Sequence, residues 1–290
     1  MKRFTCLILA LVFSLSLAFS AAAWQTINED KDFSIKVMSF NVRCIAMEQN
    51  PVNNWINRKD NVLEVIEVFK PDIIGFQELK EPQYQFFRDN LNEYGFYGEH
   101  RHSFELISEA SAIFWKKNRF EALEKETFWL SETPEVMSKG WDASVERICT
   151  QIKFRDNLTQ EGFIHFNTHL DHQGSVAKTQ SVNLILDKIE DKGMPSLVTG
   201  DFNFHEGGQN YELLLSENLQ DTKYLAPKNN TDFGPTFNGF RGSSHTRPID
   251  FILTSPEFCA NKYKVIRNTD EQGNYPSDHF PVIAEVEFTK

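Results

Sequence analysis

In six short segments of the sequence, an acid, an amide or a histidine stands just before or just after an apolar, β-branched run. In the segment PSLVTGDFNFHEGG (195–208), the apolar run stops at Gly200 and is followed by Asp201 and Asn203. Since residues i and i+2 of an extended chain point to the same side, this carboxylate and this amide can contact one common group. The remaining segments place the following residues beside similar runs: Asn41, Glu78, His169 with Asp171, Asp250, and Asp278 with His279.

Each of these polar residues has an ordinary structural explanation when it is considered alone. Asn41 is compatible with a turn, Glu78 with the first turn of a helix and Asp250 with a cap. Together they need another explanation, because buried carboxylates have to be paired or bound to a metal. Oxygen ligands and two histidines suit Mg²⁺ or Mn²⁺ with a phosphate substrate, and the sequence lacks the thiolate and paired-histidine spacing of a typical zinc site.

Strand and helix patterns alternate along the chain and supply the elements that position these residues. Alternating or continuous apolar segments predict strands over 35–42, 72–77, 111–115, 148–154, 163–170, 196–200, 249–254 and 282–288. Helical periodicity predicts helices over 58–69 and 176–190. Because no linker or repeat interrupts this pattern, we predict one layered α/β domain with two sheets packed face to face and helices on the outside.

The N-terminal segment is set apart from the rest by its composition. A basic start (Lys2–Arg3), an apolar core (7–19) and the small residues AAA (21–23) form the pattern of a cleaved secretory signal. The apolar core is shorter than the roughly 20 residues that span a bilayer. We therefore expect a signal peptide over 1–23, one catalytic domain over 24–290, a secreted or periplasmic (cell-envelope) location, and no stable membrane insertion of the mature chain.

Charge and cysteine content narrow the function further. The formal net charge of −11 disfavours broad, non-specific affinity for nucleic acid, which usually requires a basic face. A local basic groove, or a metal that neutralises phosphate, remains compatible with this charge. Outside the predicted signal peptide the sequence has Cys44, Cys149 and Cys259, so at most one intramolecular disulfide is possible and its pairing stays open.

The order of the motifs SFNVR, IIGFQE, NTHLDH, TGDFN, IDFIL and YPSDHFPV closely resembles the endonuclease/exonuclease/phosphatase family, the deoxyribonuclease-I-like superfamily. The resemblance covers about residues 34 to 288, and the segment 128–150 further resembles a secreted or cell-envelope branch. The resemblance implies a four-layered α/β sandwich in which two mixed β-sheets pack face to face with helices on the outside. It also implies cleavage of phosphodiesters or phosphomonoesters with a divalent metal.

The resemblance implies roles for the residues that meet metal and water. Asn41 and Glu78 resemble the metal-site pair, with Glu78 as the main ligand, and Asp278 is expected to be an additional ligand. Asp201 resembles the residue that positions or deprotonates the attacking water. Asn203 resembles the residue that orients the nucleophile and the phosphate.

The histidines and one arginine are expected to contact the substrate. His279 resembles the phosphate-contacting histidine, and Asp250 resembles the carboxylate that orients it and favours imidazolium. His169 resembles a histidine near the leaving group, acting as hydrogen-bond donor or general acid. Arg147 is suited to bidentate phosphate binding, or else forms a structural ion pair. His172 either contacts the substrate or supports His169.

The sequence therefore predicts an exported hydrolase of phosphate esters that uses Mg²⁺ or Mn²⁺ and in-line attack of water. Our leading expectation is a phosphodiester, so that nucleic acid is one candidate substrate. The alternative is a monoester of a small phosphorylated metabolite, sugar or lipid headgroup. A non-catalytic phosphate-binding protein is the third class, which we disfavour because no residue of the expected site is missing. The sequence implies no protein partner and leaves one or two metals open.

Overall fold

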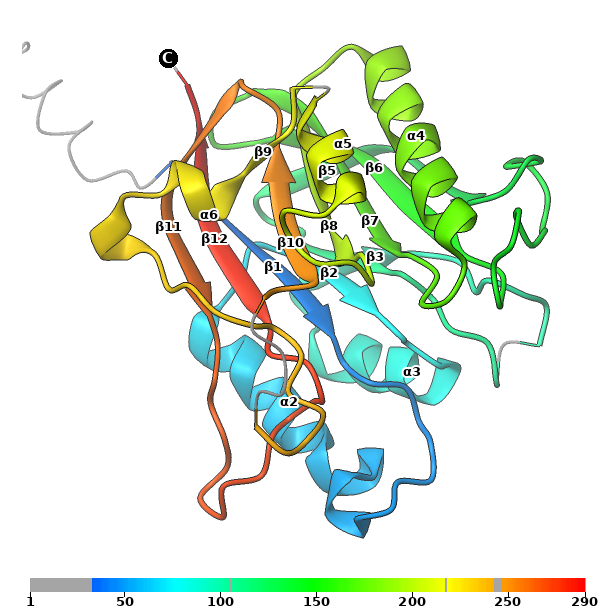
Figure 1. Cartoon of the computed structure of the whole chain (residues 1–290). Coiled ribbons are helices and arrows are strands. Elements are labelled where there is room, and N and C mark those ends of the chain that lie inside the picture. The colour runs from blue at the N-terminus through cyan, green and yellow to red at the C-terminus, as the bar shows by residue number, and fades with distance from the viewer. Residues whose placement is uncertain (1–32, 105, 217, 243–246, 290) are drawn as a thin grey trace, which may run out of the picture. The chain divides into compact units, whose positions relative to one another are not determined.

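Two six-stranded β-sheets lie at the centre of the protein (Figure 1), with the orders β11–β12–β1–β2–β4–β3 and β5–β6–β7–β8–β10–β9. The strands of the first sheet are β11 (Phe258–Val265), β12 (Val282–Phe288), β1 (Ile35–Asn41), β2 (Ile73–Gln77), β4 (Ile113–Lys116) and β3 (Tyr94–Tyr97). Those of the second are β5 (Phe120–Trp129), β6 (Ile148–Asp156), β7 (Gly162–His169), β8 (Ser196–Asp201), β10 (Asp250–Thr254) and β9 (Gln220–Asp221). Both sheets are mixed, because β1–β2 and β7–β8 are parallel pairs among antiparallel neighbours.

This computed structural model describes residues 33–104, 106–216, 218–242 and 247–289. The labelled elements lie in one compact unit that starts at Ser34, and the predicted signal peptide lies outside the described residues. The longer helices are α2 (Trp55–Phe69), α3 (Glu81–Asn90), α4 (Ser175–Lys192) and α5 (Gln209–Ser216). The short helical turns are η1 (Pro51–Asn53), α6 (Thr222–Leu225) and η2 (Lys228–Asn230).

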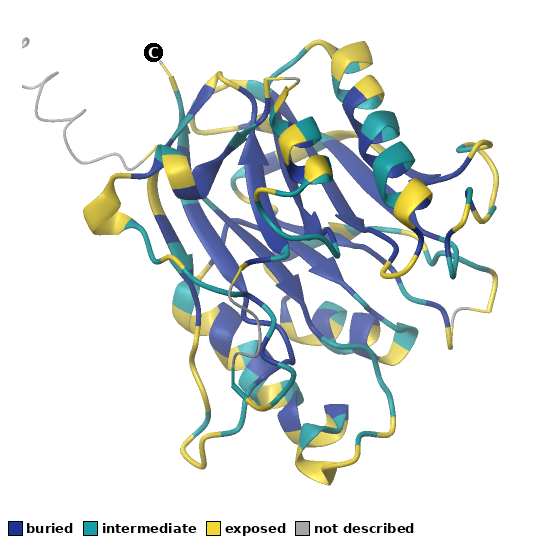
Figure 2. Cartoon of the chain, viewed as in Figure 1, coloured by how far each residue is buried: buried dark blue, intermediate teal, exposed yellow. Residues whose placement is uncertain are grey.

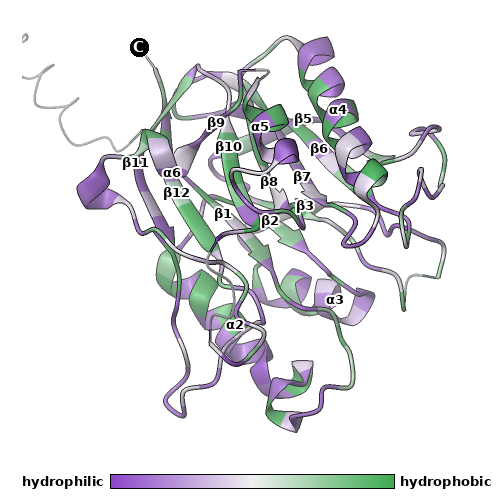
Figure 3. Ribbon diagram, in the orientation of Figure 1, coloured by the Kyte–Doolittle hydropathy of each residue, from purple (hydrophilic) through white to green (hydrophobic). Residues whose placement is uncertain are grey.

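Helices cover the outer faces of both sheets. In Figure 1, α2 and α3 lie on one side of the strands and α4 and α5 on the other. One apolar core fills the space between the two sheets, a second joins the first sheet to α2 and α3, and a third joins the second sheet to α4 and α5. Figure 2 shows the strands buried along most of their length, and Figure 3 shows hydrophobic residues along β10 and β12. The predicted four-layered sandwich is confirmed.

All eight predicted strands and both predicted helices are present. The strands that were not predicted are β3, β5, β9 and β11, and each of them lies at an edge of its sheet. Edge strands are partly solvated and commonly carry charges that block further pairing. In β5 the sequence FEALEKETFW has four charged side chains, which obscure the alternation of apolar and polar residues typical of a strand.

The sheets are joined near one end by buried polar side chains as well as by apolar ones. Gln77 of β2 donates a hydrogen bond to the Asn167 carboxamide oxygen of β7 at 2.8 Å, and Asn167 donates to the Phe76 carbonyl at 2.8 Å. The Thr199 hydroxyl of β8 donates to the same Asn167 oxygen at 3.0 Å. Gly75 allows this close approach, because a Cβ there would overlap the Thr199 and Asn167 side chains. The polar contacts fix the register of one sheet against the other.

The helices and cysteines bear on the expected absence of membrane insertion and on the one possible disulfide. Among the helices of the described residues, none has the length and apolar character needed to cross a bilayer. Cys44, Cys149 and Cys259 are free thiols.

Candidate active site

The sheet topology brings the predicted site residues to one end of the sandwich. Asn41 ends β1 and Glu78 follows β2, which runs parallel to β1. In the second sheet, His169 ends β7 opposite Asp201, and Asp201 lies opposite Asp250 across the antiparallel β8–β10 pair. The carboxyl ends of the two parallel pairs therefore meet where β10 begins.

Asp201 lies at the centre of this group. Its Oδ2 atom accepts a hydrogen bond from Asn41 Nδ2 at 3.0 Å, and the ring nitrogens His169 Nε2 and His279 Nε2 lie 3.5 and 3.6 Å from it. Its Oδ1 atom accepts from the Asn203 backbone N–H at 3.0 Å. One carboxylate thus contacts groups from both sheets.

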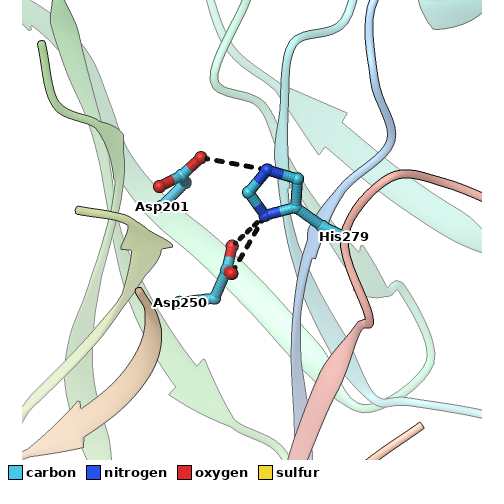
Figure 4. A group of neighbouring side chains, drawn as sticks. All are labelled: Asp201, Asp250 and His279. Atoms are coloured by element: carbon cyan, nitrogen blue, oxygen red, sulfur yellow. Dashed lines mark hydrogen bonds and ion pairs between the residues drawn. The ribbon is translucent and has the colours of Figure 1, made fainter. Parts of the chain in front are cut away.

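His279 is held between two carboxylates, as Figure 4 shows. Its Nδ1 lies 3.1 and 3.0 Å from the two carboxylate oxygens of Asp250, and its Nε2 faces Asp201. All three side chains are buried. Nδ1 beside Asp250 orients the ring, and Asp250 is the carboxylate that the family resemblance implied for this role.

Glu78 has an unusual backbone conformation and two hydrogen bonds to its carboxylate. Its φ angle is 64°, in the left-handed region that residues with a Cβ rarely adopt. Its Oε1 accepts from Asn41 Nδ2 at 3.0 Å and its Oε2 from the Cys44 backbone N–H at 2.8 Å. Asn41 therefore joins a carboxylate of the first sheet to Asp201 of the second.

The donor set around Glu78 fits a hard divalent cation. Each carboxylate oxygen has about two lone-pair sites, and the two hydrogen bonds to Glu78 occupy one site on each oxygen. The side chain is only partly buried, so the remaining sites are open to a cation with oxygen ligands and water. The Asn41 carboxamide oxygen accepts from the Arg43 backbone N–H at 3.0 Å, so the ligand role of Asn41 stays a prediction.

A second group of metal-ligand types consists of Asp201, Asp250 and His279, each with one ligand atom within 4.8 Å of the others. The contact between His279 and Asp250 favours a protonated ring, and an imidazolium has no lone pair to offer a metal. The protonated His279 ring can donate a hydrogen bond to an anion such as phosphate, while the two carboxylates balance its charge. Of the two, the surroundings of Glu78 are the better cation site.

Asp278 lies near the candidate cation site at Glu78, but its carboxylate also contacts other residues of the chain. Its Oδ2 is 3.8 Å from Arg43 Nε, and its Oδ1 accepts from the Ser277 hydroxyl at 3.3 Å. The same hydroxyl donates to the Asn41 carbonyl at 2.8 Å. Ser277, which the sequence did not single out, therefore ties the segment before β12 to the end of β1.

Arg147 forms an ion pair on the His169 side of the site. Its Nε lies 3.5 Å from Asp171 Oδ2 and its Nη2 lies 3.1 Å from His172 Nδ1. The Asp171 carboxylate also accepts hydrogen bonds from the backbone N–H groups of Gln173 and Gly174. The structural ion pair foreseen for Arg147 is present, and its guanidinium has further donors for an anion. His172 is exposed beside it.

The surroundings shift the pKa values of the central groups in different directions. Burial and the neighbouring Asp250 charge raise the pKa of Asp201 to about 7. Burial opposes protonation of His279, but Asp250 and Asp201 raise its pKa well above the ordinary value. Burial and the Arg147 charge lower the pKa of His169 well below the ordinary value. His279 is thus the charged histidine near neutral pH and His169 the neutral one.

Glu78 stays ionised in the same cluster. Burial alone would raise its pKa, but the nearby His169 and the hydrogen bonds from Cys44 and Asn41 lower it below the ordinary value. Because His169 is itself largely neutral near pH 7, the two hydrogen bonds and the charge of His279 keep the pKa of Glu78 low. An ionised carboxylate is the form that binds a cation.

A model of the Endonuclease/Exonuclease/phosphatase family matches residues 38–279. The structure of a mannosyl-6-phosphatase of Bacteroides thetaiotaomicron VPI-5482 is 33% identical, covers 88% of this chain and 100% of that chain, and superposes with a TM-score of 0.81.

Two curated proteins match in sequence as well. Protein L388 of Acanthamoeba polyphaga mimivirus is 30% identical over 181 residues, which is 58% of this chain and 67% of that protein. The probable RNA exonuclease NGL3 of Saccharomyces cerevisiae is 22% identical over 195 residues, which is 58% of this chain and 37% of that longer protein.

Proposed function

The chain belongs to the endonuclease/exonuclease/phosphatase family and is a hydrolase of phosphate ester bonds, and we propose that it removes phosphate from a small phosphorylated sugar with the help of Mg²⁺ or Mn²⁺. The observation that carries the hydrolytic part is the environment of Asp201. Its Oδ2 faces the two histidine nitrogens His169 Nε2 and His279 Nε2, and its pKa is raised to about 7. A base with a pKa near the working pH is suited to accept a proton from water.

The remaining residues take complementary parts in this proposal. The Asn203 N–H and Asn41 Nδ2 hold the Asp201 carboxylate through Oδ1 and Oδ2, and a remaining lone-pair site on Oδ2 would orient the water. His279, kept charged by Asp250, stabilises the negative charge that develops on the phosphate oxygens. Neutral His169 donates a hydrogen bond to the leaving-group oxygen or to the phosphate. Water thus gives one proton to Asp201 and forms the new bond to phosphorus, while the bond to the sugar oxygen breaks and that oxygen takes up a proton from solvent to leave as an alcohol.

A divalent cation at Glu78 would neutralise charge on the phosphate when it is bound. Glu78 would hold it through the carboxylate sites that Asn41 and Cys44 leave open, and Asp278 lies beside it. The oxygen-rich donor set supports Mg²⁺ or Mn²⁺ rather than a thiolate-bound metal.

The sugar monoester is favoured by similarity and charge. Of the relatives described above whose names state a substrate, the mannosyl-6-phosphatase has the higher identity and is matched over its full length. The net charge of −11 also disfavours a polyanionic substrate. A phosphodiester is the second candidate, because the sequence match to a probable RNA exonuclease supports it.

Hydrolysis of three esters by the purified protein tests both candidates. Mannose 6-phosphate, p-nitrophenyl phosphate and bis-p-nitrophenyl phosphate would be compared with Mg²⁺ and with Mn²⁺, and Asp201→Asn serves as the inactive control. We expect turnover of the two monoesters that the variant loses. Preference for the diester would favour the second candidate, and activity retained by Asp201→Asn would contradict the assigned base.

We also propose that the protein acts outside the cytoplasm, supported by the signal pattern over 1–23. Expression of the full chain followed by cell fractionation and N-terminal sequencing tests this. We expect an exported product that begins after Ala23, and an uncleaved product in the cytoplasm would contradict export.

A further inference from the structure

Arg58 of α2 is a fully buried cation that contacts carbonyl groups. Its side chain donates hydrogen bonds from Nε to Asn53 O (2.9 Å), from Nη1 to Val42 O (2.6 Å) and Pro276 O (2.9 Å), and from Nη2 to Arg43 O (2.6 Å). Only 2% of the residue is exposed. Packing and capping of α2 explain the bond to Asn53, but they do not explain the other three.

The other three carbonyls belong to the two segments that carry the candidate metal site. Val42 and Arg43 directly follow Asn41, while Pro276 directly precedes Ser277 and Asp278. The Arg58 guanidinium therefore joins the loop after β1 to the loop before β12. The Ser277 hydroxyl, which donates to the Asn41 carbonyl, joins the same two loops.

The loop after β1 needs this support because of its shape. Arg43 has a φ angle of 56°, so it holds a left-handed conformation that a non-glycine residue adopts only under constraint. Its carbonyl accepts from Arg58 and also from Gln83 Nε2 of α3 at 2.9 Å. This conformation aims the Arg43 N–H at Asn41 and the Cys44 N–H at Glu78.

A guanidinium suits this task better than any other side chain. It is planar and presents five donors, and charged donors make stronger hydrogen bonds than neutral ones. Burial of a cation is costly, so a lone arginine at this position needs the bonds that it makes. Lysine has one ammonium group on a flexible stem, which cannot reach carbonyls spread over two loops in the same fixed plane.

We infer that Arg58 is a positioning residue of the active site: it holds the loops after β1 and before β12 so that the Cys44 N–H and Asn41 fix the Glu78 carboxylate for a divalent cation. The part that concerns the cation rests on the proposed function. The part that concerns loop geometry stands on the hydrogen bonds alone.

Arg119 offers a matched control. It is also a largely buried arginine, and it donates to Ser34 O at 2.6 Å and to Asp72 at 3.0 Å. Ser34 precedes β1, so Arg119 lies at the end of the first sheet opposite to Asn41. Arg119→Lys should therefore remove comparable stability without reaching the site.

Three measurements on the full chain separate the two arginines. We would determine the melting temperature, the Mn²⁺ affinity by calorimetry, and amide hydrogen exchange of the segment that contains Cys44. Both Arg58→Lys and Arg119→Lys should lower the melting temperature. Only Arg58→Lys should weaken Mn²⁺ binding by tenfold or more, lower kcat by a similar factor and speed exchange at Cys44.

The opposite results overturn the inference. If Arg58→Lys matches Arg119→Lys in Mn²⁺ affinity and in exchange at Cys44, Arg58 is only a packing residue. If Arg58→Lys does not fold, Arg58→Gln and Arg119→Gln are compared in the same assays, and equal Mn²⁺ affinity with equal exchange at Cys44 in these two variants rejects the proposal. Absence of Mn²⁺ binding in the wild type would reject the proposed function, while exchange at Cys44 would still decide the role of Arg58.

Discussion

Asp201 and Asp250 lie directly opposite each other in the β8–β10 ladder, and both carboxylates face the ring of His279. Two acids therefore share one imidazolium. Asp250 touches the ring at 3.0 Å and balances most of its charge, so Asp201 is left buried beside another carboxylate. The pKa of Asp201 rises to about 7 for this reason, burial being the larger cause. Asp250 therefore serves as the charge partner of His279, and Asp201 is available as a base.

The replacement Asp201→Asn should abolish turnover while preserving the fold. The amide can still accept the Asn203 N–H, but it cannot take a proton from water. A lost general base costs about 10²–10⁴-fold in rate, so kcat should fall by at least that factor. The melting temperature should stay close to that of the wild type. Measurable turnover above one tenth of wild type would show that another group is the base.

The replacement Asp250→Asn should move the whole pH–rate profile to lower pH. The Asp250 charge raises the pKa of His279 and, after burial, that of Asp201. The descending limb above neutral pH reports loss of the His279 proton, and the ascending limb reports ionisation of Asp201. Removal of Asp250 lowers both pKa values, so both limbs should shift in the acid direction, and kcat should fall about 10- to 100-fold. A shift of either limb to higher pH would contradict this pairing.

The replacement Glu78→Gln should weaken the response of activity to Mg²⁺ while leaving the fold largely intact. The amide keeps one oxygen and a similar shape but loses the charge that binds a cation. The Mg²⁺ concentration for half-maximal activity should rise at least tenfold, and calorimetry with Mn²⁺ should show the same loss of affinity. Glu67→Gln, at an exposed position of α2, serves as a control for the loss of one negative charge. A fully active Glu78→Gln protein with unchanged Mg²⁺ dependence would refute the assignment.

His165 should make the protein less stable as the pH falls. It is fully buried in β7, with its Nε2 2.8 Å from the Thr199 hydroxyl, and burial lowers its pKa to about 3. The unfolded chain protonates this histidine near pH 6.5, whereas the folded chain does so only near pH 3. The unfolded state therefore binds more protons between these values. Stability is fully present above pH 6.5 and falls below it by up to about 1.4 kcal/mol per pH unit.

Urea denaturation at several pH values between 4 and 7 tests this effect. In His165→Gln the free energy of unfolding should depend less steeply on pH than in the wild type, because the side chain no longer titrates. The stability at pH 7 should fall, since Gln replaces a packed ring. An unchanged slope in the variant would mean that other groups set the pH dependence.

Gly75→Ala should destabilise the contact between the sheets. The added methyl group overlaps the Thr199 hydroxyl and the Asn167 carboxamide, and overpacking of this kind costs about 1–3 kcal/mol. Gly162→Ala in β7 is a suitable control, because its Cβ would meet other atoms only at ordinary contact distance, 3.7 Å. The two variants would be compared by thermal denaturation. Equal melting temperatures would show that the sheets tolerate a wider spacing than the structure suggests.

The sequence was informative wherever burial left a regular pattern. Central strands such as β1, β2 and β8 are buried on both faces and read as apolar runs, so their positions could be predicted. In the edge strands β5 and β11, charged residues are interspersed among apolar ones, so their sequences resemble those of loops or exposed helices. Pairing with a single neighbour, rather than local preference, fixes these strands, and a single sequence does not show such pairing.

The same limit applies to the candidate site. Side chains that end central strands, such as Asp201 and Glu78, could be found because an acid beside an apolar run is conspicuous. The Cys44 backbone N–H and the carbonyls bound by Arg58 carry no side-chain signal, so their part in the site could not be predicted. Arg58 itself resembled an ordinary residue near the start of a helix. Its contact with Pro276 joins positions far apart in the chain.

The pairing of β12 with β1 places the last strand of the chain between the first strand and β11. His279 lies just before β12, so the site lacks its charged histidine until this strand has been synthesised and has paired with β1 and β11. A chain in which β12 has not paired is therefore expected to be catalytically silent. Recovery of activity after denaturation therefore requires β12 to pair between β1 and β11.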